Sequence, residues 1–277
     1  MDPRPGRPFA DDRLHLRVLC VHRNHIDAWW RSARRCDPYW RLYVNAEAGA
    51  SIVHRAKRLP LPAGRIVLVP AGTAFATVPA ERPIDHLYLH FDLLGLSHTT
   101  VSALFPAPFT VPADAAGAEL ARLLHGLLPS AGTPGLLPAA KALAFHALHH
   151  LFASLSPTSA AAVEVLRLSQ GDNDLTPALF MIEQHLADPV RVAVLAQACA
   201  LPLRRFATLF QAQLGMGPAR YLLERRLAAA AAQLRDSQAP IDVIAGACGF
   251  ADRFHLSRAF SRRFGMGPAA YRRQPVA

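Results

Sequence analysis

The sequence predicts an α+β protein of two domains. The N-terminal domain is a β-rich barrel or sandwich followed by helices, and the C-terminal domain is all-α, with two helix-turn-helix units joined by a helix. Short extended segments broken by Gly and Pro fill the first third of the chain, and long Ala- and Leu-rich segments follow. In the last third, one helical pattern occurs twice. With 277 residues, the chain is long enough to bury two ordinary cores.

The expected strands are short, rich in β-branched and aromatic residues, and either alternating or fully apolar. They cover residues 14–21, 39–45, 51–54, 65–69 and 86–91. Turns containing Gly and Pro separate them, and several short strands at this spacing are typical of a small barrel or sandwich. The Pro-rich residues 1–13 predict a flexible arm before the first strand.

Two long helices are expected after the strands, at residues 113–128 and 136–155, and the short loop between them makes them antiparallel neighbours. The second helix carries one apolar stripe. Its members are Leu137, Ala140, Ala144, Ala147, Leu151 and Leu155. The stripe either packs on the strands or forms the seam of a dimer, and the pattern alone allows both.

A polar connector with a short helix at 160–168 separates these helices from the last part of the chain, where the pattern is helical throughout. The predicted organisation therefore has four parts. They are an arm at 1–13, a strand-rich domain with its helices at 14–155, a linker at 156–174 and a helical domain at 175–277.

The helical domain contains a duplicated unit. Gly215-Met216-Gly217-Pro218 returns as Gly265-Met266-Gly267-Pro268, and the pattern that ends at Cys199 returns at Cys248. Each copy consists of a short helix, a tight turn and a second helix, which is the helix-turn-helix arrangement. The copies span 192–214 and 241–264, and a helix at 219–234 joins them. Gly249 fits the second turn, because that turn requires a positive φ.

Helix-turn-helix units bind DNA by placing the second helix in the major groove. In the second copy, the apolar positions leave Arg253, Phe254, Ser257, Arg258 and Arg262 on the outer face. Arg253 and Arg258 are the candidates for guanine contacts. Arg262 is expected to contact phosphate, which positions the protein without specifying sequence.

The first copy and the C-terminus supply further candidates. In the first copy, Arg204 is the candidate for reading a base, and Ala207 and Thr208 are candidates for contacting a thymine methyl group. Arg263, Arg272 and Arg273 are expected at phosphates with Arg262.

The charge distribution agrees with a polyanionic partner for the helical domain. Residues 175–277 hold 13 basic and 6 acidic residues, whereas residues 1–174 hold 17 basic and 14 acidic residues. Most of the net charge of +10 of the whole chain therefore lies in the helical domain. Nearly all the basic residues are Arg, which suits bidentate contacts to guanine and phosphate. A GC-rich genome would produce the same preference for Arg.

The region from about Leu175 to Arg273 resembles the DNA-binding domain of the AraC/XylS family of bacterial transcription regulators. The second-unit signature is matched by Ile241, Ile244, Ala245, Gly249, Phe250, Arg258, Phe260, Gly265, Pro268, Tyr271 and Arg272. The pattern of the connecting helix is matched by Arg226, Leu227, Ala230 and Leu234. The sequence departs from the family pattern at Arg191, Pro202, Thr208, Phe254 and Leu256, which affects expected base contacts more than the fold.

The resemblance implies a sequence-specific, DNA-binding transcriptional regulator, and an activator because most members of the family activate. It also implies a homodimer formed through the helices after the barrel, promoter DNA as the partner, and RNA polymerase as a second partner of an activator. The expected location is the bacterial cytoplasm, on the nucleoid when bound. The four cysteines lack CxxC spacing and are expected to be reduced thiols, and no apolar run is long enough to predict a membrane span.

The N-terminal strands around residues 40–43, 64–70 and 86–92 are similar to the family's cupin-like effector domain. This similarity implies a small effector bound inside the barrel. The candidate ligand-binding residues are Trp40, Tyr43, His54, His86, Tyr88 and His90, since aromatic rings with a few polar groups suit an organic ligand. Core packing is the alternative role for each ring.

Metal and catalytic chemistry find little support in the sequence. His54, His86 and His90 would suit a metal, but the metal-binding signature of cupin enzymes is absent. His146 and His150 are spaced for one helix face but lack a third ligand. No Gly-rich phosphate loop or nucleophile elbow is present, so no enzyme activity, metal or cofactor is assigned. The alternatives are a cupin-type metalloenzyme with a DNA-binding tail, and a constitutive DNA binder whose N-terminal domain only dimerises.

Overall fold

The computed structural model describes residues 14–94, 96, 98–129, 133–169 and 175–273, so the arm expected at 1–13 lies outside the described residues. The described strands form two antiparallel sheets. The larger has the order β1-β8-β3-β6-β9 and the smaller the order β2-β7-β4-β5. The strands are β1 (Leu16–Ile26), β2 (Ser32–Arg35), β3 (Trp40–Asn45), β4 (Ser51–His54), β5 (Lys57–Pro60), β6 (Ile66–Val69), β7 (Phe75–Val78), β8 (Ile84–Leu93) and β9 (Phe109–Thr110).

The larger sheet is buried on both faces, because successive side chains along its strands point alternately into two separate cores. On β8, Leu87, Leu89 and Phe91 belong to a core shared with helices, whereas Tyr88 belongs to a core shared with the smaller sheet. Side chains two residues apart share a face, so His86 and His90 lie with Tyr88 on the side of the smaller sheet. The strand is therefore almost continuously buried.

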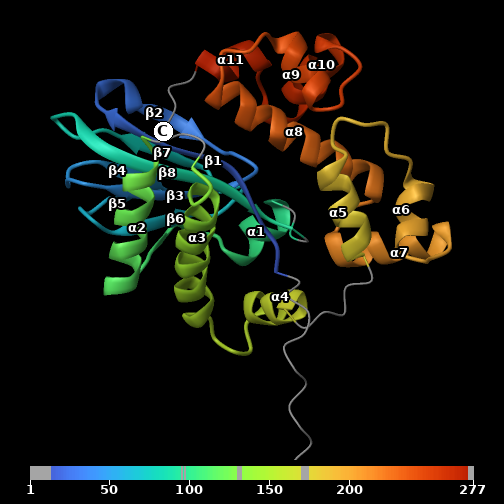
Figure 1. Cartoon of the computed structure of the whole chain (residues 1–277), viewed down its shortest axis with the longest axis horizontal. Coiled ribbons are helices and arrows are strands. Elements are labelled where there is room, and N and C mark those ends of the chain that lie inside the picture. Colours follow the sequence, from blue (N-terminus) through green and yellow to red (C-terminus); the bar gives the residue numbers. More distant parts are fainter. Residues whose placement is uncertain (1–13, 95, 97, 130–132, 170–174, 274–277) are drawn as a thin grey trace, which may run out of the picture.

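Helices α2 (Ala115–Leu127) and α3 (Leu136–Ala153) cover the outer face of the larger sheet (Figure 1). The apolar stripe of α3 packs on this sheet, with Ala140, Ala144 and Ala147 fully buried. Leu137, at the start of the stripe, is 52% exposed. Of the two roles that the sequence left open for the stripe, packing on the strands accounts for most of its members.

The connector predicted at 156–174 contains α4 (Ala160–Ser169), and Ala161 of this helix joins the same core as α2 and α3. A further short helix, α1 (His98–Leu104), follows β8. A single 3-10 turn at Ala28–Trp30 lies between β1 and β2.

The C-terminal part is a set of helices beside the sheets (Figure 1). They are α5 (Thr176–Gln184), α6 (Val192–Ala198), α7 (Leu203–Leu214), α8 (Pro218–Asp236), α9 (Ile241–Ala247), α10 (Arg253–Phe264) and α11 (Pro268–Arg273). One core lies among α5 to α8 and another among α8 to α11, and Tyr39, which precedes β3, also belongs to the second. Helix α8 contributes to both cores, with Tyr221 and Leu222 in the first and Leu227 and Leu234 in the second.

In the described part of the chain, no individual helix combines the length and apolar character that crossing a bilayer requires. Taken together, α6 and α7 would meet those criteria by length and composition, but they are bent by 88° at the turn between them.

Candidate nucleic-acid interface

The two helix-turn-helix units consist of helices of the same lengths, but the turn of the first unit is one residue shorter than that of the second. The bend of 88° between α6 and α7 is close to the interhelical angle of about 90° that the motif requires. The turn places Ala200 at a φ of 51° in the first unit and Gly249 at a φ of 74° in the second. The expectation of a positive φ at Gly249 is confirmed, and Ala200 holds the same conformation with a side chain that disfavours it.

The second recognition helix is better capped than the first. The Asp252 carboxylate accepts a hydrogen bond from the backbone N–H of His255 at 2.6 Å, which satisfies one free donor of α10. Helix α7 begins after Pro202 and α6 after Arg191, and neither residue makes a side-chain cap hydrogen bond. The departures from the family pattern at these two positions therefore remove caps from the first unit.

Helix α10 presents the predicted contact residues on its outer side. Leu256 and Phe260 are buried, while Arg253, Arg258 and Arg262 are exposed. Phe254 is 59% exposed, which is unusual for a large apolar side chain. Ser257, the remaining predicted residue of this helix, is half-buried.

Arg253 is held only loosely in the free protein. Its guanidinium lies 3.7 Å from the carboxylate of Asp242 and 4.8 Å from the ring centroid of Phe254. Because Arg253 and Asp242 are both more than half exposed, solvent weakens this ion pair. The side chain can exchange these contacts for a base or a phosphate with little loss.

Helix α7 presents a less charged surface. Arg204 and Thr208 are exposed and Ala207 is half-buried. The Thr208 hydroxyl donates a hydrogen bond to the Arg204 carbonyl oxygen at 3.0 Å. That donor is therefore occupied, which leaves the methyl group as the natural contact for a thymine methyl.

Two arginines that the sequence assigned to phosphate make internal contacts instead. Arg263 donates to the Glu224 carboxylate at 2.9 Å and ties α10 to α8. Arg272 donates to the carbonyl oxygen of Ala239 at 2.6 Å. Arg262 and Arg273 remain exposed and are the better candidates for phosphate contacts.

Sequence reasoning missed how the two units are joined. The guanidinium of Arg226 on α8 donates to the carbonyl oxygens of Leu186 and Asp188, at 2.8 and 2.6 Å, in the segment after α5. The same guanidinium lies against Gly249, where a Cβ atom would collide with it and with the Leu186 carbonyl oxygen. The turn of the second unit is thus fitted against α8 and the segment after α5, and only glycine leaves the space.

A second set of ion pairs joins the N-terminal domain to α8. Arg225, which is buried, donates to the Asp92 carboxylate of β8 at 2.5 Å and to the Glu183 carboxylate of α5 at 2.5 Å. Arg17 of β1 also pairs with Glu183. Burial raises the pKa of Asp92 to about 6, although the Arg225 charge lowers it, so the carboxylate is ionised at neutral pH.

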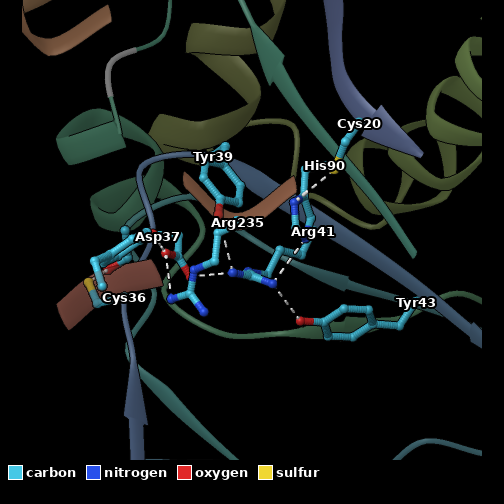
Figure 2. Close-up of polar contacts among 10 residues, drawn as sticks. Cys20, Cys36, Asp37, Tyr39, Arg41, Tyr43, His90 and Arg235 are labelled. Atoms are coloured by element: carbon cyan, nitrogen blue, oxygen red, sulfur yellow. Dashed lines mark hydrogen bonds and ion pairs between the residues drawn. The ribbon is translucent and has the colours of Figure 1, made fainter. Parts of the chain in front are cut away.

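The other end of α8 meets the N-terminal domain through a buried polar network centred on Asp37 (Figure 2). Arg41 donates to the Asp37 carboxylate at 2.5 Å, Arg235 of α8 lies 3.8 Å from it, and Tyr271 of α11 donates its hydroxyl to it. Burial alone would raise the pKa of Asp37. The charges of Arg41 and Arg235 and the Tyr271 hydrogen bond outweigh it and hold the pKa below its ordinary value.

Arg41 also contacts His90 and Tyr43, on the face of the larger sheet that meets the smaller sheet (Figure 2). One of its nitrogens lies 3.0 Å from Nε2 of His90 and 3.2 Å from the Tyr43 hydroxyl. Since the guanidinium can only donate, His90 Nε2 accepts, and Nδ1 carries the proton that faces Cys20 Sγ at 3.1 Å. Burial and the Arg41 charge keep the pKa of His90 well below its ordinary value, so the ring is neutral.

The predicted effector residues are only partly brought together. The ring centroids of Tyr43 and Tyr88 lie 5.0 and 5.7 Å from the ring centroid of His86. The ring centroids of His90 and Tyr88 lie 5.1 Å apart. Trp40, by contrast, packs on Phe91 and Phe105 in the core shared with the helices. Trp40 and Tyr43 are three residues apart on β3, so their side chains lie on opposite faces of the larger sheet.

His54 and His86 make separate contacts. His54 Nδ1 lies 2.8 Å from the carbonyl oxygen of Ala74, and His86 Nδ1 lies 2.6 Å from the side-chain oxygen of Asn45. Burial, followed by the Arg41 charge, lowers the pKa of His86 to about 3. Within the described ranges, His54, His86 and His90 do not form a cluster with metal-ligand spacing.

A pocket of about 690 Å³ lies between the two domains, next to the Asp37 network. Its walls come from β2 with the residues before and after it, and from α8, α10 and α11 with the turn after α10. The arginines among the lining residues are Arg31, Arg34, Arg35, Arg235 and Arg263. Burial, with the neighbouring charges of Arg41 and Arg235, lowers the pKa of Arg35 to about 10, so it remains charged.

Comparison with known proteins agrees with the duplicated helical motif. A family profile described as a helix-turn-helix domain matches residues 195–274. A probable transcriptional regulator, LumQ of Photobacterium leiognathi, is 38% identical over 90 residues, which are 32% of this chain and 36% of the relative. A putative AraC-like transcription regulator of Streptomyces antibioticus is 37% identical over 105 residues, covering 38% of this chain and 35% of the relative.

A longer match reaches into the N-terminal domain. The transcriptional activator RhaS of Pectobacterium carotovorum is 32% identical over 164 residues, covering 58% of this chain and 56% of the relative. The chain spans about a third of the length of the first two relatives. All three relatives are described as regulators or activators of transcription rather than as enzymes. Residues 195–274 are therefore a helix-turn-helix domain, and this part of the chain is similar to AraC-like transcription regulators.

Proposed function

We propose that the protein is a sequence-specific DNA-binding transcriptional regulator whose DNA binding responds to a small-molecule effector. The observation that carries the proposal is the pair of recognition helices, α7 and α10, which are mounted on the single helix α8. Both helices have exposed arginines on their outer surface. A duplex that meets both helices is contacted in two major-groove segments about 34 Å apart.

The contacts divide into two kinds. Arg253 and Arg258 read guanine, with Phe254 and Ser257 beside them, and Arg204 with Ala207 and Thr208 reads bases in the first unit. Arg262 contacts phosphate and contributes affinity without sequence preference. All four arginines are exposed, so each is accessible to DNA.

The effector binds in the N-terminal domain, in the space between the sheets. The candidate residues that face this space are Tyr43, His54, His86, Tyr88 and His90. Around the ring of His86, three buried polar atoms lack a hydrogen-bond partner among the described residues: His86 Nε2, Asn45 Nδ2 and Trp30 Nε1. A polar organic molecule with donors and acceptors would satisfy them.

Effector binding reaches the DNA-binding units through α8. Arg41 contacts both the inter-sheet space, at Tyr43 and His90, and the Asp37 network, which holds Arg235 and Tyr271. An effector that displaces the Arg41 guanidinium therefore weakens the docking of α8 and α11. Such a ligand shifts the docking equilibrium only by its difference in affinity for the docked and undocked forms.

The proposed regulator function also implies the partners of the protein. The protein is a homodimer on promoter DNA in the cytoplasm, and the exposed Leu123 and Leu137 of α2 and α3 support a dimer contact through these helices. It acts as an activator that contacts RNA polymerase, as the relative RhaS is described as an activator.

Selection of bound sequences from a random duplex pool, with purified full-length protein, tests the function. Two enriched blocks about one helical turn apart are expected, and Arg258→Ala is expected to change one of them and Arg204→Ala the other. If the wild-type protein enriches no sequence with or without cell metabolites, it is not a sequence-specific regulator. If a thermal-shift screen of metabolites finds a ligand whose effect survives His86→Ala, the effector binds elsewhere.

A further inference from the structure

A cluster of three potential metal ligands lies where the beginning of α2 meets the second half of α3. Asp114 immediately precedes α2, and His146 and His150 are one helical turn apart on α3. The three side chains offer one ligand atom each, and these atoms all lie within 4.8 Å of one another. The sequence alone showed only two ligands, because the third lies outside α3, directly before α2.

The separations are close to those of a metal site. Nε2 of His146 lies 3.2 Å from one carboxylate oxygen of Asp114, and Nε2 of His150 lies 2.7 Å from the other. In a tetrahedral zinc site with bonds of about 2.0–2.1 Å, neighbouring ligand atoms lie about 3.3 Å apart. The third separation, between the two histidine nitrogens, is within 4.8 Å, so side-chain rotation has to bring these nitrogens into place around one ion.

Asp114 is held in place independently of the histidines. Its Oδ1 accepts a hydrogen bond from the backbone N–H of Gly117 at 2.6 Å and so caps α2. Ligands of a metal site are commonly fixed by such a second contact, which orients the donor atom before the ion arrives. Both histidines are part-buried rather than enclosed, so an ion can enter from solvent.

Gly117 keeps the space beside His146 open. A Cβ atom at this position would lie 2.8 Å from Nε2 of His146 and 3.2 Å from the Asp114 carboxylate oxygen. Any larger residue would push the imidazole away from the carboxylate. This glycine lies in a helix, where alanine is the better helix former, so helix stability does not explain its presence.

We propose that Asp114, His146 and His150 bind one divalent transition-metal ion, with zinc as the preferred metal, and that the ion clamps α2 to α3. Two imidazoles with one carboxylate suit Zn²⁺ and its first-row neighbours, whereas Ca²⁺ and Mg²⁺ prefer all-oxygen sites. Three protein ligands leave a fourth position for water or for a group supplied by a partner.

Titration of metal-stripped, full-length protein without a polyhistidine tag tests the site. Under reducing conditions, Zn²⁺ and Co²⁺ are expected to bind at one ion per chain. Co²⁺ is expected to show the visible absorption of a four- or five-coordinate ion without thiolate charge transfer, because the cluster holds no cysteine. Zn²⁺ is also expected to raise the melting temperature, since it binds the folded chain.

Four variants and one control define the ligands. His146→Ala, His150→Ala and Asp114→Asn are each expected to weaken binding by about tenfold or more, and asparagine retains the helix cap. Gly117→Ala is expected to keep the fold and weaken binding. His149→Ala is the matched control, because this exposed histidine neighbours His150 on the same helix but lies outside the cluster.

The proposal is overturned if the folded wild-type protein binds neither ion stoichiometrically. It is also overturned if His149→Ala weakens binding as much as His150→Ala, or if the His146→Ala and His150→Ala variants still bind one ion with unchanged affinity. Circular dichroism of each variant separates a lost ligand from a lost fold, and Gly117→Ala, which removes no ligand, provides the check that does not depend on truncating a histidine.

Discussion

The hydroxyl of Tyr271, in the last described helix, donates a hydrogen bond to the carboxylate of Asp37, which lies 234 residues earlier in the chain. Tyr271 belongs to the core of the second helix-turn-helix unit, where its ring packs on Phe260 and Phe264. Asp37 belongs to the segment between β2 and β3. The ring of Tyr271 therefore packs in the core of the DNA-binding unit, while its hydroxyl forms part of the contact with the N-terminal domain.

Tyr271→Phe separates these two roles, because it keeps the ring and removes the hydroxyl. We expect a loss of about 1–2 kcal/mol in the free energy of unfolding, since a buried carboxylate loses a donor. Asp37→Asn removes the charge that faces Arg41 and Arg235, and a loss of about 3 kcal/mol or more is expected. Urea unfolding of the full-length protein measures both. Equal stability of Tyr271→Phe and wild type would mean that the hydrogen bond does not hold the domains.

The Asp37 network also predicts a dependence on acid. The pKa of Asp37 is lower in the folded protein than its ordinary value of 3.8, so the unfolded chain binds the proton more readily. The stability that the ionised carboxylate contributes is present above about pH 4 and is lost as the pH falls toward the folded pKa. The difference in unfolding free energy between wild type and Asp37→Asn should be constant from about pH 5 to pH 7 and shrink below about pH 4. A difference that grows with acid would contradict this sign.

The paired turns of the two units offer a test with opposite signs. Ala200 has a φ of 51°, which costs an L-residue about 1 kcal/mol, so Ala200→Gly is expected to stabilise the protein slightly, by about 0.5 kcal/mol. Gly249→Ala is expected to destabilise it by about 2 kcal/mol or more, because the new methyl group meets Leu186 and Arg226. Thermal unfolding compares the two. If both substitutions shift the melting temperature in the same direction, the turns are not equivalent.

The arginines of α10 are expected to differ in what they do on DNA. Arg258→Ala should reduce discrimination at one base pair by about 1–3 kcal/mol, whereas Arg262→Ala should weaken all sequences alike and reduce the salt dependence by about one phosphate contact. Binding titrations on the selected site and on mismatched sites, at several salt concentrations, distinguish these outcomes. Arg122→Ala on α2 is the control, since this exposed arginine lies away from both recognition helices.

The helical domain was largely predictable because its signals are local. Helices α6 and α7 together span 192–214 and α9 and α10 span 241–264, as predicted for the two copies, since apolar periodicity and the turn residues define them. The strands missed by the sequence are β2, β5, β7 and β9. Three of these, β2, β5 and β9, lie at sheet edges, where the first two carry charged residues that interrupt any alternation.

The contacts between the domains were not predictable from the sequence. Asp37, Asp92 and Arg225 have no pattern that marks them, because a buried ion pair between distant segments leaves no periodic signal. Arg235 similarly appears in the sequence as one more polar residue of a long helix. The core that Trp40 joins was not predictable for another reason: strand periodicity predicts alternation but does not say which face meets which core.

Helix α8 contributes side chains to both helical cores, and this has a consequence for the DNA that the protein can recognise. A helix shared by two cores cannot flex between them without opening one. The protein then dictates the separation of its two target segments, and a promoter cannot adapt by gaining or losing base pairs between them. Inserting half a helical turn would rotate one segment to the opposite side of the duplex. The spacing between the two segments of an operator should therefore vary less than its individual bases.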